Sequence, residues 1–140
     1  MKLGYSKTAA ATPAFALIAE GWNELVQEGL TPDMRGDCPV SWTNSVIFAA
    51  RDDGEIVGVV CYNPCDVTKS FVVSLGYVEP TSRKQGVFRE LWAALVVKAK
   101  EAHVARVVVD VSVQNSAALA ILRHLGVPAA SCAHELILGS

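Results

Sequence analysis

The sequence lacks a long apolar stretch. Hydrophobic residues make up 51% of the 140 positions, yet no uninterrupted run approaches the roughly 18 residues that a membrane-spanning helix needs. The first residues also lack the apolar core of a signal peptide. We therefore expect a chain without a membrane span, located in the cytoplasm.

A basic stripe is missing as well. The chain has 12 Lys and Arg against 14 Asp and Glu, for a net charge of −2. The basic residues are dispersed, and the local cluster is Arg83-Lys84 with Arg89 one helical turn further on. Nucleic-acid binding needs a concentrated positive surface, so nucleic acid is not expected as the main partner.

Cysteines are few, and their spacing matches no zinc template. The chain has Cys38, Cys61, Cys65 and Cys132. We interpret them as thiols in a reducing compartment and expect no metal. Cys132 and His134 are neighbours in sequence, but nothing in the pattern orients them as nucleophile and base.

Repeats, low-complexity tracts and linkers are absent, so the length predicts one domain spanning 1–140. Thr12-Pro13 begins a helical pattern that Gly29 would end. Asp52-Asp53-Gly54 joins two β-type runs as a hairpin. The expected strands are 46–51, 55–62, 70–78, 106–113 and 133–138, and the later helices are 86–103 and 116–125.

The most informative segment is the passage from the strand 70–78 into the helix 86–103. The first amides of a helix have no partner within it, and the helix dipole makes that end positive. Gly86 allows a ligand close to the backbone, and Arg83 and Lys84 add full charges. This turn is therefore a candidate cradle for a pyrophosphate.

Two motifs resemble those of the GNAT superfamily of acyl-CoA-dependent N-acyltransferases. The first is Val78-Glu79-Pro80 followed by Arg83-Lys84-Gln85-Gly86-Val87-Phe88. The second is Asn115-Ser116-Ala117-Ala118 followed by Leu125-Gly126-Val127, about 30 residues further on, the length of one β-α-β unit. The resemblance covers residues 46–127. It implies an α/β fold: a mixed, twisted sheet with a splayed parallel strand pair, flanked by helices on both faces.

The resemblance also implies acetyl-CoA as cosubstrate and residues that would bind it. Val78 would offer backbone groups to the pantetheine arm, as an added strand would. The pyrophosphate would be held by the amides of Arg83, Lys84, Gln85, Gly86, Val87 and Phe88. Asn115 and Ala118 of the second motif would lie at the pantetheine. Asn115 could equally be a simple helix cap, worth ~1 kcal/mol.

The catalytic candidates are Asp110, Glu79 and Tyr77. Asp110 is a carboxylate in a run of valines, which is costly to bury unless it is paired or lies in an opening. It could serve as base or as amine binder, or it could point from the sheet into solvent. Glu79 and Tyr77 stand near the strand end, and Glu79 could instead be a solvated turn residue.

Three positions depart from the family pattern. Phe88 replaces a small residue, Val127 replaces an aromatic, and Leu122 stands where the family most often has the Tyr that protonates the leaving thiolate. The resemblance implies acetyl transfer to a primary amine, on a small molecule or a protein, by direct attack. The departure at Leu122 keeps open a CoA-binding protein with little catalysis, and a domain for another phosphate ligand is a third hypothesis.

The residues expected to cover the acceptor are aromatic and acidic, which would suit a cationic amine, although packing and solvation would explain each one alone. They are Trp22, Asp33, Met34, Asp37 and Trp42. The sequence names no acceptor, and it leaves a homodimer open.

Overall fold

A computed structural model describes residues 1–30, 40, 43–112, 114–127 and 134–138. Asp33, Met34, Asp37 and Trp42 of the expected acceptor lining lie outside the described residues, as do Cys38 and Cys132. Within the described part, no helix is both long and apolar enough to cross a membrane. The same residues contain no group of three or more His, Cys, Asp or Glu side chains that could hold a metal ion.

Strands and helices alternate along much of the chain. In order, they are β1 (Lys2–Ser6), the short 3-10 helix η1 (Ala9–Ala11), α1 (Phe15–Glu28), β2 (Ser45–Ala50), β3 (Ile56–Cys65), β4 (Ser70–Val78), the 3-10 helix η2 (Pro80–Ser82), α2 (Val87–Glu101), β5 (Arg106–Val109), α3 (Ser116–His124) and β6 (His134–Ile137).

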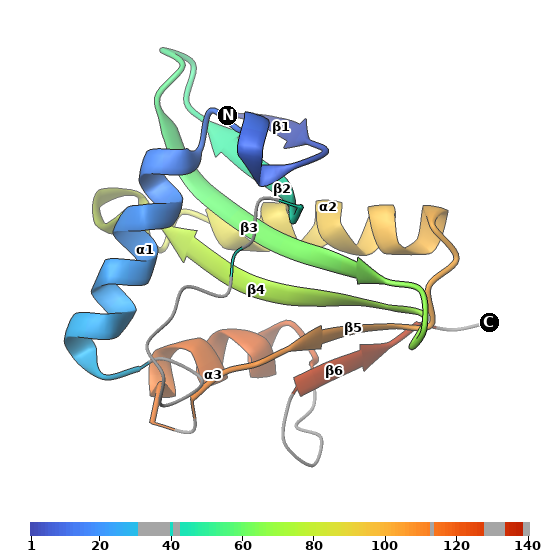
Figure 1. The fold of residues 1–140 in the computed structure, drawn as a ribbon. Helices are drawn as coiled ribbons and strands as arrows, with labels where there is room; N and C mark the ends of the chain where they lie inside the picture. Colours follow the sequence, from blue (N-terminus) through green and yellow to red (C-terminus); the bar gives the residue numbers. More distant parts are fainter. Residues whose placement is uncertain (31–39, 41–42, 113, 128–133, 139–140) are drawn as a thin grey trace.

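The strands form one six-stranded sheet in the order β1-β2-β3-β4-β5-β6. Neighbours are antiparallel except β4 and β5, which are parallel and joined through α2. Helix α1 covers one face of the sheet, and α2 and α3 cover the other (Figure 1). This confirms the mixed sheet with a parallel pair and helices on both faces.

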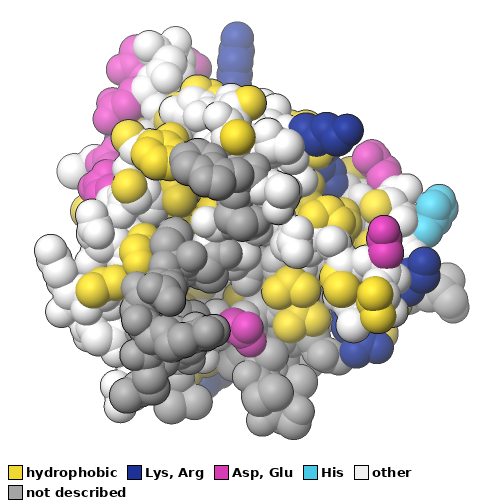
Figure 2. Space-filling view, in the orientation of Figure 1, with side chains coloured by type: hydrophobic (Ala, Val, Ile, Leu, Met, Phe, Trp, Pro, Cys, Tyr) yellow, Lys and Arg dark blue, Asp and Glu magenta, His cyan; other side chains and the backbone are white. Residues whose placement is uncertain are grey.

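Two hydrophobic clusters hold the layers together, one on each face of the sheet. On one face, Leu91 and Leu95 of α2 pack with Val60 and Val107 of the sheet. On the other, Leu17 and Ile18 of α1 pack with Val59 and other strand residues. Trp22 is also buried, with 8% of the residue exposed, which agrees with the packing interpretation of this residue. In Figure 2, the Lys and Arg side chains of the visible face lie mostly along its right-hand side.

Several predicted boundaries were wrong. β1 was not anticipated, because this short edge strand leaves its side chains half-exposed or exposed and so shows little hydrophobic pattern. β3 continues through Pro64, predicted as loop, where exposed residues pair with β4. β5 ends at Val109 and not at Val113, so the run of valines is not all strand. Helix α1 starts at Phe15, two residues after Pro13.

Candidate active site

The parallel strands β4 and β5 share only the first half of β4. Their register runs from Ser70 opposite Arg106 to Val73 opposite Val109. β5 stops there, whereas β4 continues to Val78, and Figure 1 shows the two strands diverging towards their C-terminal ends. Along the second half of β4, the edge that faces away from β3 therefore has no strand partner among the described residues.

β4 is irregular at the point where this pairing ends. On its other side, Cys61 of β3 is opposite Leu75, but Tyr62 is opposite Val73. Ser74 is thus an extra residue on β4, which is the arrangement of a β-bulge. A bulge turns the strand locally, and bulges are frequent beside active sites.

A tightly held turn follows β4. Glu79 begins η2, and its Oε1 accepts hydrogen bonds from the amide nitrogen of Thr81 at 3.1 Å and from the Thr81 hydroxyl. Lys84 and Gly86 then have positive φ angles of 63° and 80°. A left-handed conformation is uncommon for lysine and costs energy, and such residues concentrate at ligand-binding sites.

Helix α2 starts from this turn without a capping side chain. Gly86 is its N-cap residue and makes no side-chain hydrogen bond to the helix. The first bond inside the helix runs from the amide of Glu90 to the Gly86 carbonyl, so the amides of Val87, Phe88 and Arg89 precede the helical ladder. A Cβ built on Gly86 meets no atom within 4 Å. The helix therefore offers donors and partial positive charge at an open position, as an anion site requires.

Two glycines let the start of α2 lie close to the sheet. A Cβ on Gly58 would lie 2.6 Å from a Val87 methyl carbon, and one on Gly76 would lie 2.6 Å from the Phe88 ring. Phe88 is half-buried against the core. The Phe88 ring therefore turns inward, and it approaches the β4 backbone closely at Gly76.

The side chain of Arg83 makes several contacts within the protein. Its Nε donates to the Val78 carbonyl at 2.9 Å, and its Nη2 lies 2.9 and 3.0 Å from the two carboxylate oxygens of Glu24. The guanidinium also lies over the Tyr77 ring, 5.4 Å from its centroid. In this state, the carbonyl assigned to the pantetheine arm already has a partner.

Glu24 is a site residue that the sequence analysis missed. Its Oε2 accepts a 2.5 Å hydrogen bond from the Tyr77 hydroxyl. That bond and the Arg83 guanidinium hold the pKa of the Glu24 carboxyl below its usual range. Burial and the Glu24 carboxylate raise the pKa of Tyr77, so this phenol is a neutral donor already in use. No local signal marks Glu24, which reaches the site because α1 packs across the end of β4.

Glu79 also has a structural task. Its first oxygen caps η2, while its Oε2 is buried without a hydrogen-bond partner among the described residues. The alternative of a solvated turn carboxylate does not describe it, because the residue is half-buried. This capping leaves Glu79 a weaker base candidate than a carboxylate at the opening between β4 and β5.

Asp110 follows β5 directly and is exposed. The strand ends at Val109, so Asp110 lies beyond it, and its exposure agrees with the alternative of a side chain that points into solvent. Its position is nevertheless where β5 leaves β4, since Val109 is the last residue paired with that strand.

The second motif forms a capped helix. The Oδ1 of Asn115 accepts a 3.1 Å hydrogen bond from the amide of Ala118 at the start of α3. The capping role of Asn115 is thereby confirmed, and its contact with a pantetheine arm stays a prediction. Leu122 on the same helix is 3% exposed and belongs to the core.

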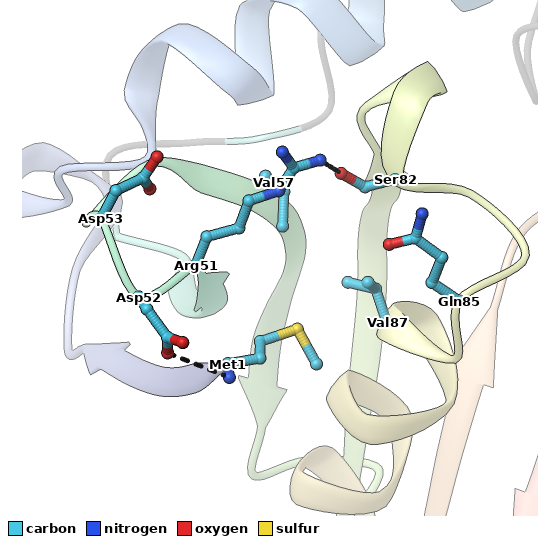
Figure 3. Close-up of a pocket in the computed structure, with 8 residues that line it drawn as sticks. All are labelled: Met1, Arg51, Asp52, Asp53, Val57, Ser82, Gln85 and Val87. Atoms are coloured by element: carbon cyan, nitrogen blue, oxygen red, sulfur yellow. Dashed lines mark hydrogen bonds and ion pairs between the residues drawn. The ribbon is translucent and has the colours of Figure 1, made fainter.

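A hollow of about 510 Å³ lies beside the turn of residues 83–88, the candidate phosphate turn, between this turn and the hairpin of β2 and β3 (Figure 3). Arg51 reaches across it, and its Nη2 donates to the buried hydroxyl of Ser82. The hollow is lined by Met1, Arg51, Asp52, Asp53, Val57, Ser82, Gln85 and Val87. The hydrogen bond from Arg51 to Ser82 therefore links η2 to the end of β2.

The site thus combines an uncapped helix start with a sheet that opens between two parallel strands of an α/β domain. The acetyltransferase (GNAT) family model matches residues 15–127, and the chain belongs to that family. Members of the family use acetyl-CoA as cosubstrate. No curated protein matches the sequence.

Solved structures share the fold at low sequence identity. A Salmonella typhimurium protein solved with acetyl-CoA has 16% identity and a TM-score of 0.74, covering 100% of this chain and 96% of that one. A ribosomal-protein-alanine N-acetyltransferase from Brucella melitensis has 19% identity and a TM-score of 0.71, covering 99% and 100%.

A larger protein also contains a similar domain. N-acetylglutamate synthase from Neisseria gonorrhoeae, solved with coenzyme A and N-acetyl-glutamate, has 15% identity and a TM-score of 0.63. The match covers 86% of this chain, which spans 28% of the synthase.

Proposed function

We propose that this protein transfers an acetyl group from acetyl-CoA to a primary amine by direct attack. The observation that carries the proposal is the uncapped start of α2 beside the unpaired edge of β4. The first feature suits the pyrophosphate of CoA, and the second suits its pantetheine arm, which can pair with a strand edge through its amides.

In this proposal the amides of residues 83–88 bind the pyrophosphate, and Lys84 adds its charge from an exposed position. The pantetheine arm lies along β4 from Val78. Because Arg83 donates a hydrogen bond to the Val78 carbonyl, the arm either displaces this guanidinium or uses the neighbouring backbone groups. Asn115 and Ala118 face the arm from the start of α3.

Asp110 takes the proton of the amine. Direct attack requires a neutral amine, so a base or a water chain must remove a proton. Tyr77 and Glu79 are engaged in hydrogen bonds within the protein, which leaves the exposed Asp110 as the first choice. The similar structures include enzymes named for acetylating an alanine and a glutamate, and both of these acceptors carry a primary amine.

One observation favours a CoA-binding protein with little catalysis as the second candidate. Leu122 is buried in the core and offers no proton to a leaving thiolate. A thiol has a pKa near ~8.5, so the thiolate leaves without an acid at reduced rate. The first proposal therefore predicts a slow enzyme, and the second predicts binding without turnover.

The test combines calorimetry with a thiol-release assay. Calorimetry should show binding of acetyl-CoA, and CoA should displace ADP from the same site. Incubation with a panel of small amines and peptide N-termini should then release CoA thiol. Tight binding with no amine acetylated would favour the second candidate, and no binding of either nucleotide would contradict both.

The variant Asp110→Asn keeps the shape of the side chain and removes its charge. It should lower turnover ~100-fold or more, the usual worth of general base catalysis, while acetyl-CoA affinity stays the same. Asp66→Asn is the matched control, because Asp66 is an exposed carboxylate on the β3–β4 loop. Equal activity of wild type and Asp110→Asn across the pH range would contradict this role.

A further inference from the structure

Ser74 lies at the point of β4 where the pairing with β5 ends and the opening between the two strands begins. It is the bulged residue of β4 and the first residue beyond the last pair with β5, Val73 and Val109. Its side chain is half-buried. A bulge at the mouth of an opening redirects a side chain, and here the redirected group is a hydroxyl.

Asn44 fixes the orientation of this hydroxyl. Asn44 lies just before β2 and is 2% exposed, and its Nδ2 donates a 3.0 Å hydrogen bond to the Ser74 Oγ. A buried amide beside a strand is costly unless its hydrogen bonds are satisfied. Because the serine oxygen accepts this bond, its own hydrogen points elsewhere, and it has no acceptor among the described residues.

The length of β4 from Val78 to Ser74 is comparable to the length of a pantetheine arm. Ser74 precedes Val78 by four positions, which is ~13 Å along a strand. The pantetheine arm between phosphate and sulfur has about as many bonds as four extended residues, again ~13 Å. An arm that enters at Val78 and follows β4 therefore brings the thioester to Ser74.

We infer that Ser74 is a catalytic residue whose hydroxyl donates a hydrogen bond to the thioester carbonyl oxygen, and that Asn44 is its positioning residue. This inference rests on the proposed function. Donors aimed at an oxygen that becomes negative stabilise the transition state strongly in a water-poor site. The second donor is a strand amide of β4.

The reaction balances with Ser74 unchanged. The amine lone pair forms the C–N bond as the carbonyl π pair moves to oxygen. The C=O bond then reforms, the C–S bond breaks, and its electron pair leaves on sulfur. The nitrogen enters as a neutral amine, its first proton having passed through Asp110 to solvent. After the attack it loses a second proton to Asp110, and the thiolate gains one from solvent.

Ser74 is not the missing general acid. A serine hydroxyl is far less acidic than a thiol of pKa ~8.5, so proton transfer from Ser74 to the thiolate would be uphill. The hydroxyl thus compensates for Leu122 only in part, by lowering the barrier to attack. This separates its role from that of the family tyrosine.

A spectroscopic test does not require the acceptor to be known. Acetyl-CoA carrying ¹³C at the thioester carbonyl would be bound to the wild type, and its resonance should lie downfield of free acetyl-CoA, because a hydrogen bond polarises the carbonyl. Ser74→Ala should move the resonance upfield, and Ser74→Thr, which keeps the hydroxyl, should restore it. An identical resonance in the wild type and Ser74→Ala would overturn the role of Ser74.

The matched control is Ser45→Ala, because Ser45 is also a buried serine, but its hydroxyl donates to the carbonyl of Lys7, the residue after β1. Its resonance should equal that of the wild type. Asn44→Asp should act like Ser74→Ala, since a carboxylate accepts the serine hydrogen and withdraws it from the ligand. A wild-type resonance in Asn44→Asp would contradict the positioning role.

Kinetics and binding separate this inference from the proposed function. Once an amine substrate is found, Ser74→Ala should lower kcat ~100-fold or more, with unchanged acetyl-CoA affinity by calorimetry. If the wild type bound no acetyl-CoA, the proposed function itself would fail. If it bound acetyl-CoA with equal carbonyl resonances in both proteins, only the inference about Ser74 would fail.

Discussion

Helices α2 and α3 begin in opposite ways. The start of α3 is satisfied by its own chain, because the Asn115 side chain accepts from the Ala118 amide. The start of α2 follows Gly86, which has no side chain and provides no cap. A helix end that leaves its donors open near the surface is stabilised by an anion. The start of α3 is thus capped by its own chain, whereas the start of α2 is where the proposed function places the pyrophosphate.

The largest effect should come from closing the open end. Gly86→Glu puts bulk and negative charge among the amides of α2, so acetyl-CoA affinity should fall ~100-fold or more, as expected for a lost multi-contact phosphate site. Calorimetry measures this loss. Gly54→Glu is the control, because Gly54 also has positive φ and open space, but on the β2–β3 hairpin. Equal loss in both variants would show that backbone strain, not charge at the site, is responsible.

A second change tests whether α2 must lie so close to the sheet. Gly76→Ala would place a Cβ within 2.6 Å of the Phe88 ring and should destabilise the protein by ~1–3 kcal/mol through overpacking. Urea unfolding measures the free energy. Adding Phe88→Leu should recover part of the loss by removing the crowded ring. A double variant no more stable than Gly76→Ala alone would mean that the ring is not the cause.

A third change removes the cap of α3 and should lower the stability of the protein without changing its affinity for acetyl-CoA. Asn115→Ala removes the cap and should cost ~1 kcal/mol of unfolding free energy, while Asn115→Asp keeps an accepting oxygen and should cost less. Acetyl-CoA affinity measured in the same variants decides the second proposed role. A large affinity loss in Asn115→Asp, with stability preserved, would show that the amide of Asn115 contacts the cosubstrate.

The smallest effect concerns Glu24 and pH. Its pKa is lowered in the folded protein from an ordinary value of 4.5, so its contribution to stability is complete above that pH and is lost as pH falls through the folded value. The stability difference between wild type and Glu24→Gln should therefore be constant near neutral pH and shrink in acid below 4.5. The carboxylate is partly exposed, so solvent screening keeps the effect small. A difference that is independent of pH down to acid unfolding would contradict this account.

Much of the fold and the phosphate turn could be predicted from the sequence, because their causes are local. The sequence pattern predicted a helix over 86–103, which is observed as α2 (Val87–Glu101), and Gly86 marked its start. Asn115 was recognised as a cap from its place before a helix. Each of these features depends on groups within a few residues of one another, where spacing alone determines geometry.

The tertiary structure decided the partners of the site residues. The sequence separates Glu24 from Arg83 by 59 positions and Asn44 from Ser74 by 30, and no local pattern reveals such pairs. It also could not show that β5 ends at Val109, since valines favour strand whether or not a partner strand continues. Which side chains meet, and which strand edge stays open, depend on how α1 and the two strands pack in three dimensions, because hydrogen bonds and burial between distant segments exist only once the layers are assembled.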